Sequence, residues 1–215
     1  MGYFQIGAQG TPTPPPTFPA SVLTKMAFRA DYKQTAFQTL GKNNEIVLYQ
    51  DPSYPGISLQ QTIGSQQPTL AANGWLFDRN AQSFLSISDI SNVVEMWAVA
   101  SSLDVGIFAD MSMVMSTGFG SYYIYGSRES SNIEFSSNGI TKINNVSNND
   151  FDPLDTFKTV AFEIPQGYAL GNIGAYLSNY YFWNGYIKDV LCFSSALTST
   201  ERTALQAYLA YYHTF

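Results

Sequence analysis

The chain has 215 residues, enough for one sizeable hydrophobic core, and single all-β domains commonly reach this length. Charged residues make up only 12% of the sequence, against about 25% in typical soluble domains, so we expect a largely uncharged polar surface. The formal net charge of -6 disfavours nucleic-acid binding, and no stretch approaches the roughly 20 apolar residues that cross a membrane as a helix.

Residues 1–20 are predicted to form an extended Pro-rich N-terminal arm. Prolines favour an extended polyproline conformation of about 3.1 Å per residue, so Pro12 to Pro19 would hold the tip roughly 25 Å from the domain. At the tip, Tyr3, Phe4 and Ile6 are predicted to anchor the chain to a larger assembly. A disordered tail is the alternative interpretation.

Residues 21–215 are predicted to form a single all-β domain, because short β-rich runs alternate with Gly, Asn, Ser and Pro. The predicted strands are Ile46–Gln50, Val93–Ala100, Leu103–Phe108, Met111–Ser116, Ser121–Tyr125, Ile133–Ser136, Ile140–Val146, Phe157–Ile164 and Tyr186–Phe193. Val93–Ala100 is apolar on nearly both faces, which indicates a central strand covered on each side. Phe157–Ile164 alternates between a buried face and a mostly polar one, and the Asn138-Gly139 step predicts a hairpin.

The end of the domain is predicted to be a strand followed by an amphipathic helix. The alternation of Tyr186–Phe193 slips at Lys188 and Asp189, which indicates a β-bulge. Thr198 is predicted to cap the helix, with Glu201 as its capping-box partner. Apolar residues then recur at helical spacing at Leu205, Tyr208, Leu209 and Tyr212.

The order of these motifs resembles concanavalin A-like lectin/glucanase domains, particularly the LamG-like group, from roughly Val22 to the C-terminus. The motifs that carry the resemblance are Gln67-Pro68-Thr69-Leu70, Asn73-Gly74, Leu76-Phe77-Asp78, Gly185 to Leu191, Ala196-Leu197-Thr198, Glu201-Arg202 and Leu205 to Leu209. The resemblance implies a two-sheet antiparallel jelly-roll sandwich with one packing helix. Such domains occur in lectins, glycosidases, and the fibres, spikes and decorations of phage particles.

Fold alone does not select among these roles. By analogy, the arm and the charge-poor surface favour a non-enzymatic virion structural protein of phage type, a capsid decoration, fibre or spike component that docks on other virion proteins through residues 1–20. The N-terminus lacks the features of a secretory signal, so we expect a protein made in the host cytoplasm and displayed at the virion surface. The alternative is a carbohydrate-binding adhesin that recognises a cell-surface polysaccharide.

A glycoside hydrolase is the remote alternative. Enzymes of the resembling superfamily commonly carry paired acids in E-x-D-x-x-E or E-x-D-x-E strand motifs, and neither spacing occurs here. Glu95, Glu129, Glu134 and Glu163 remain as candidate acids. His213 is predicted to be exposed at the frayed C-terminal end, a poor position for a precisely oriented general base.

Binding is instead predicted at aromatic side chains near turns. Tyr122, Tyr180 and Trp183 each lie near a Gly- or Asn-containing turn, and aromatic rings stack on sugars and anchor protein interfaces. An interface is favoured slightly over a glycan site.

No cofactor is expected. Asp150, Asp152 and Asp155 offer oxygen ligands of the kind that calcium prefers, but their spacing matches no EF-hand and turn-rich loops contain the same residues. Cys192 is the lone cysteine, so no intrachain disulfide is expected, and it is predicted to be a small buried side chain in a strand.

Overall fold

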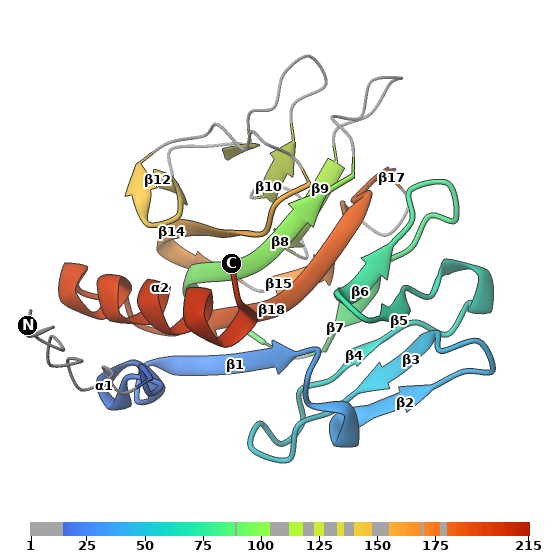
Figure 1. Ribbon diagram of the computed structural model, residues 1–215, viewed down its shortest axis with the longest axis horizontal. Coiled ribbons are helices and arrows are strands. Elements are labelled where there is room, and N and C mark those ends of the chain that lie inside the picture. The colour runs from blue at the N-terminus through green and yellow to red at the C-terminus, as the bar shows by residue number, and fades with distance from the viewer. Residues whose placement is uncertain are drawn as a thin grey trace, which may run out of the picture.

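The computed structural model describes residues 15–88, 90–103, 112–117, 123–126, 133–135, 140–147, 155–168, 170–176 and 180–215. Within these ranges the chain is mostly β, with two antiparallel sheets and one long helix, α2 (Ser199–His213), after the last strand (Figure 1). The predicted all-β, two-sheet sandwich with a C-terminal helix is therefore confirmed. The jelly-roll connectivity stays a prediction.

The first sheet, sheet A, is centred on β8 (Val93–Ser102) and β18 (Gly185–Phe193), which pair antiparallel. Its strand order is β13-β12-β14-β8-β18-β6-β5, and β1 also pairs with β18. The remaining strands of sheet A are β1 (Met26–Asp31), β5 (Thr69–Ala71), β6 (Gly74–Phe77), β12 (Ile140–Ile143), β13 (Val146–Ser147) and β14 (Lys158–Tyr168).

The second sheet, sheet B, has the order β11-β10-β9-β15-β7-β4-β3-β2. Its strands are β2 (Gln38–Leu40), β3 (Ile46–Tyr49), β4 (Leu59–Gln60), β7 (Leu85–Ile87), β9 (Ser112–Thr117), β10 (Tyr123–Gly126), β11 (Ile133–Phe135) and β15 (Leu170–Ile173). The smaller elements are a ribbon of β16 (Ala175–Tyr176) and β17 (Tyr180–Phe182), the short helix α1 (Ala20–Leu23), and the 3-10 turns η1 (Thr35–Phe37) and η2 (Gly64–Gln66).

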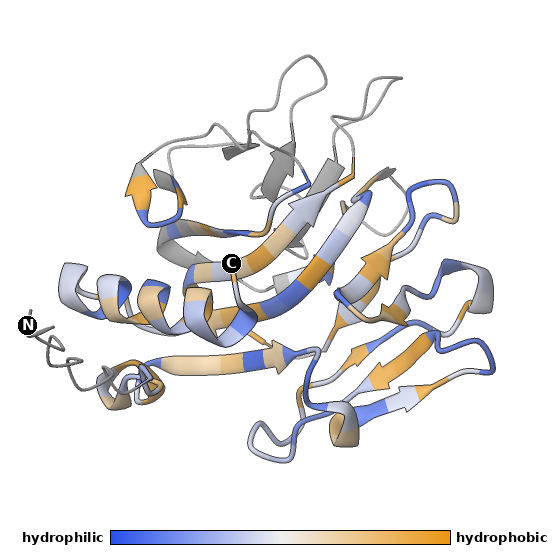
Figure 2. Ribbon diagram, in the orientation of Figure 1, coloured by the Kyte–Doolittle hydropathy of each residue, from blue (hydrophilic) through white to orange (hydrophobic). Residues whose placement is uncertain are grey.

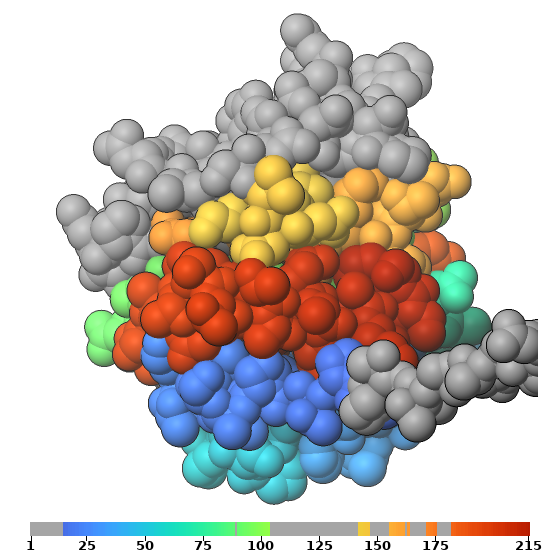
Figure 3. Space-filling view, turned by 60° about the vertical axis from the view of Figure 1, so that its left-hand side comes forward, coloured from blue at the N-terminus to red at the C-terminus, as the bar shows by residue number. Residues whose placement is uncertain are grey.

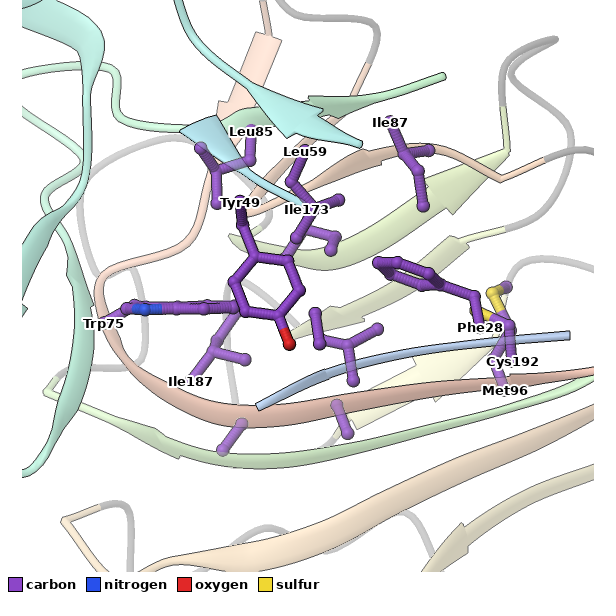
Figure 4. Packing of buried hydrophobic residues seen from close by; sticks show 14 of the residues in the cluster. Phe28, Tyr49, Leu59, Trp75, Leu85, Ile87, Met96, Ile173, Ile187 and Cys192 are labelled. Atoms are coloured by element: carbon purple, nitrogen blue, oxygen red, sulfur yellow. The ribbon is translucent and has the colours of Figure 1, made fainter. Parts of the chain in front are cut away.

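The main core lies between the two sheets (Figure 4). Tyr49 of β3 meets Trp75 of β6 edge to face, with ring centroids 5.5 Å apart, and both rings are fully buried. Aromatic side chains bury a large apolar area each, and edge-to-face pairs add to that burial. Cys192 is also buried in this core, as the sequence predicts. These contacts hold the two sheets face to face.

Helix α2 adds a third layer on the outer face of sheet A. It begins with the predicted capping box, because the Thr198 hydroxyl accepts from the Glu201 backbone N–H while the Glu201 carboxylate accepts from that of Thr198. Leu205 and Leu209 then pack in a second core that includes Trp97 of β8. Figure 3 shows α2 lying between β1 on one side and β12 on the other. The prediction that Val93–Ala100 is covered on both faces is thus confirmed.

Two predictions about the hairpins are wrong. The predicted strand Ile140–Val146 is divided into β12 and β13 by Asn144 and Asn145, which both have positive φ, the conformation that two-residue hairpin turns require. The predicted hairpin across Asn138-Gly139 does not form either, because β11 pairs with β10 in sheet B and β12 pairs with β14 in sheet A.

The expected polar face of Phe157–Ile164 is buried at Thr159 and Ala161, whereas Glu163 stays partly exposed. Thr159 and Ala161 lie under α2, and the Thr159 hydroxyl donates to Gln206 of the helix. The strands predicted at Met111–Ser116, Ser121–Tyr125 and Ile133–Ser136 appear with shifted ends as β9, β10 and β11, whereas that at Leu103–Phe108 lies outside the described residues except Leu103.

Candidate functional site: a buried ion cluster and the base of the arm

A β-bulge in β18 turns two consecutive charged residues toward α2. The pairing of β18 with β8 shifts register between Ile187 and Asp189, which confirms the predicted bulge. Ile187 and Val190 pack between the sheets, but Leu191 packs on the helix side. The extra residue leaves Lys188 and Asp189 both in contact with the C-terminal end of α2. Figure 2 shows this hydrophilic stretch in the middle of the otherwise mostly hydrophobic strand β18.

The carboxylate of Asp189 is fully buried and accepts hydrogen bonds from two side chains. Arg29 of β1 donates from Nε to both Asp189 oxygens at 3.1 Å and from Nη2 to Oδ2 at 2.6 Å. His213, in the last turn of α2, places Nε2 2.9 Å from the same Oδ2. Since an ionised carboxylate only accepts hydrogen bonds, His213 Nε2 carries the proton in this contact. One carboxylate therefore joins β1, β18 and α2.

Asp31, at the end of β1, is the second buried acid of this group. It accepts from the Tyr212 hydroxyl at 2.8 Å, from Arg29 Nη2 at 3.3 Å and from the Lys33 backbone N–H at 3.0 Å. The five side chains of Arg29, Asp31, Asp189, Tyr212 and His213 are called the clasp cluster below.

Burial and mutual attraction set the charges in the clasp cluster. Burial would raise the pKa of Asp189, but Arg29 and the hydrogen bond from His213 outweigh it and hold that pKa below its usual range. Burial likewise opposes the charge on Arg29, yet Asp189 raises its pKa. Burial, followed by repulsion from Asp189, raises the pKa of Asp31. The cluster thus combines one cation with two unequal carboxylates.

The clasp cluster does not fit a metal centre. Ligand atoms of Asp31, Asp189 and His213 lie within 4.8 Å of one another, close enough to share a cation. The guanidinium of Arg29 already contacts both carboxylates, so a metal ion would meet a fixed positive charge and compete for the same oxygen lone pairs. The arrangement works as a structural ion group that fastens the end of α2.

A second ion group fastens the first turn of α2. Glu95 of β8 is 1% exposed and accepts from Trp97 Nε1 at 2.8 Å and from the Leu197 backbone N–H at 2.9 Å. Arg202 of α2 grips the same carboxylate with Nε at 2.9 Å and Nη2 at 2.8 Å. Glu163 of β14 lies 3.1 Å from Arg202. Glu95 and Glu163, the two candidate acids of the hydrolase alternative whose side chains are described, thus both contact Arg202 of the helix.

The side chains of the other two candidate acids, Glu129 and Glu134, are not described. Glu129 lies outside the described residues, and Glu134 lies in β11, where the backbone alone is described.

A third ion pair fastens the start of α2. Lys25 Nζ lies 2.6 Å from Glu201 Oε2. This hydrogen bond from Lys25, followed by that from the Thr198 backbone, lowers the pKa of Glu201 to about 2. Ion groups therefore tie both ends of the helix, the first turn to Lys25 and β8 and the last turn to β1 and β18.

The described base of the arm docks beside the clasp cluster. Phe18 meets Tyr208 of α2 edge to face, with ring centroids 4.9 Å apart, and the guanidinium carbon of Arg29 lies 5.2 Å from the centre of the Phe18 ring. The Pro19 carbonyl then accepts from the Val22 backbone N–H as α1 begins. The described end of the arm, from Pro15 on, is thus held against the domain at Phe18. Its predicted anchors Tyr3, Phe4 and Ile6 lie outside the described residues.

The predicted surface aromatics are not brought together. Trp183 is 1% exposed and belongs to the core between the sheets, so its prediction as a glycan or interface residue is wrong. Its backbone N–H donates to the Gly174 carbonyl at 2.8 Å, which places the residue along the end of β15, inside the sandwich. Tyr122 lies outside the described residues, and Tyr180 begins β17, where its side chain is not described.

The predicted calcium ligands lie mostly outside the described residues. Asp150 and Asp152 are not described, and Asp155 is exposed.

The prediction that His213 is exposed is wrong, because the helix continues to this residue and buries it against Asp189. One signal in the sequence pointed this way. Leu205, Leu209 and His213 are spaced four residues apart, so they share one helix face, and that face is the buried one. The partners of His213 carry no such signal, since Arg29 lies far away along the chain and Asp189 reaches the helix through a bulge.

Among the described residues, neither helix has the length and apolar character needed to cross a membrane. The chain matches no protein-family model, no curated protein and no solved structure.

Proposed function

We propose that this chain is a non-enzymatic structural protein of a larger particle, a phage-type virion, attached through its N-terminal arm. In this proposal the sandwich is displayed at the virion surface as a decoration, fibre or spike component. The observation that carries the proposal is the docked base of the arm: Phe18 packs against Tyr208 and Arg29, next to the point where residues 1–14 join the described chain. A docked base is useful to an attachment arm, because it limits the orientations of the domain relative to its support.

The interior of the domain supports the same proposal. Ion pairs at Glu201, Arg202 and His213 hold α2, on which Phe18 packs, to Lys25 and to sheet A. Glu95 and Glu163, which a hydrolase would need free, are occupied by Arg202. The adhesin alternative has lost Trp183 and rests on Tyr122 and Tyr180, whose side chains are not described.

The test replaces Tyr3, Phe4 and Ile6 together by Ser in the gene that the particle uses. Purified particles are then assayed for this chain by quantitative mass spectrometry. We expect the triple variant to be absent from particles although the domain still folds, as judged by an unchanged melting temperature. The matched control is Gln5→Ala with Gln9→Ala, which keeps the arm length and its apolar residues and should be incorporated normally. Normal incorporation of the triple variant contradicts the proposal.

A further inference from the structure

The two buried acids of the clasp cluster share one guanidinium unequally. Arg29 makes three hydrogen bonds to Asp189, the shortest 2.6 Å long, but only one to Asp31, at 3.3 Å. His213 adds a hydrogen bond to Asp189 alone. An oxygen of Asp31 lies within 4.8 Å of an oxygen of Asp189, and both residues are almost fully buried. Two carboxylates in one buried site repel each other, so the one with the weaker cationic partner binds a proton more readily, and the geometry makes Asp31 that carboxylate.

The two lysines near the pair are directed at the end of α2 instead. Lys33 Nζ donates to the Tyr212 carbonyl. Lys188 Nζ donates to the His213 carbonyl at 3.2 Å. Cations at a helix C-terminus offset the negative end of the helix dipole. An ion pair with the two acids would raise the pKa of Lys188, yet burial, followed by repulsion from Lys33, lowers it.

The remaining titratable groups around the pair carry no positive charge. They are four phenols, one buried thiol and one further acid, contributed by the segment after β1, by β3 and the segment after it, by β18 and by α2. These residues are Tyr32, Tyr49, Tyr54, Tyr208, Cys192 and Asp51. Within the described part of the chain, Arg29 is therefore the cation that both acids of the clasp cluster contact.

A proton on Asp31 has an acceptor in place. The Tyr212 hydroxyl oxygen lies 2.8 Å from Asp31 Oδ2, and because a hydroxyl both donates and accepts, a protonated Asp31 can donate to it. The other oxygen, Oδ1, still accepts from the Lys33 backbone N–H. Protonation thus keeps β1 connected to the last turn of α2 while it removes the repulsion between Asp31 and Asp189.

We propose that the clasp cluster is a pH-sensitive fastening, in which Asp31 takes up one proton as the pH falls from neutral and the cluster then holds β1, β18 and the last turn of α2 together more stably. This property belongs to the domain itself and does not depend on the attachment role proposed for the arm.

Linkage gives the sign of the effect. Burial, followed by repulsion from Asp189, raises the pKa of Asp31, so the folded chain binds this proton more readily than the unfolded chain does. Asp31 therefore adds stability as the pH falls through its folded pKa, and the gain is complete once the pH is below the ordinary value of 3.8. Asp189 acts in the opposite direction, because its pKa is lowered and its contribution is lost only below 3.8.

The first test follows the two carboxyl groups in the full-length chain by NMR. The ¹³C shifts of the aspartate Cγ atoms are recorded from neutral pH to below 3.8 and are assigned with Asp31→Asn and Asp189→Asn. We expect the midpoint of Asp31 above 3.8 and that of Asp189 below it. In Asp189→Asn the midpoint of Asp31 should fall, because the repelling charge is gone. An Asp31 midpoint at or below 3.8 in the wild type, or one that Asp189→Asn leaves unchanged, overturns the inference.

The second test measures urea unfolding of the wild type and Asp31→Asn over the same pH range. The amide resembles the protonated acid at every pH, so the urea midpoint of the variant minus that of the wild type should decrease as the pH falls toward 3.8. The direction of this change does not depend on any fixed cost of the amide. Asp155→Asn, which removes an exposed carboxylate outside the clasp cluster, is the matched control. A difference that stays constant, increases, or follows the control overturns the inference.

Discussion

The clasp cluster makes a quantitative prediction through Asp189→Asn. This change keeps the size of the side chain but removes the charge that meets Arg29 at 2.6 Å and His213 at 2.9 Å. Removing one partner of a buried ion pair costs about 3–5 kcal/mol, because the remaining charge stays buried. In this variant Arg29 still contacts Asp31, at 3.3 Å, so we expect the loss of stability to lie at the low end of this range, about 3 kcal/mol. For a chain of this length that corresponds to a melting temperature lower by about 6–12 °C.

The assay is urea unfolding followed by tryptophan fluorescence, with a thermal scan for the melting temperature. The matched control is Asp155→Asn, which removes an exposed carboxylate and should change stability by less than about 0.5 kcal/mol. If Asp189→Asn costs no more than this control, Asp189 does not fasten β1, β18 and α2, and the reasoning about the clasp cluster is refuted.

Three further predictions test other parts of the fold. The pKa of Glu201 is lowered to about 2, so the contribution of its charge to stability is complete above the ordinary pKa near 4.5 and is lost as the pH falls through 2. The difference in urea midpoint between the wild type and Glu201→Gln should therefore shrink as the pH falls from 4.5 to 2. A difference that stays constant over this interval contradicts the ion pair. Gly174→Ala would place a Cβ 2.2 Å from the buried ring of Phe77, whereas a Cβ at Gly56, which has a similar positive φ, would meet open space. In chemical unfolding, Gly174→Ala should lower the free energy of unfolding by about 1–3 kcal/mol more than Gly56→Ala does. Equal losses in the two variants contradict the packing at Gly174. Trp183→Ala should destabilise the domain by about 3–5 kcal/mol as a core residue, whereas a loss below 1 kcal/mol indicates a surface ring.

The elements predicted correctly are those whose evidence is local in the sequence. The capping box at Thr198, the spacing of Leu205 and Leu209, and the two-sided apolar pattern of Val93–Ala100 each follow from a few adjacent residues. The bulge at Lys188 belongs with them, because a slip in alternation is visible within one strand.

Apart from the local turn at Asn144-Asn145, which divides the predicted strand Ile140–Val146, the errors concern residues whose surroundings come from distant parts of the chain. Thr159 was expected at a polar surface, but α2 covers it from a position 40 or more residues later in the sequence. Trp183 adjoins a turn, which suggested exposure, yet its neighbours across the sandwich bury it. His213 follows the buried stripe of its helix, and its ion partners on β1 and β18 could not be deduced from spacing.

The central claim, that the arm attaches this domain to a particle, is tested most directly by electron cryo-microscopy of particles whose copy of the gene lacks the codons for residues 3–14. The deletion keeps Phe18 and the docked base, so the domain itself should remain folded. We predict that the density of the sandwich disappears from the particle surface while the rest of the particle is unchanged. Sandwich density that persists at the same place and occupancy contradicts the claim.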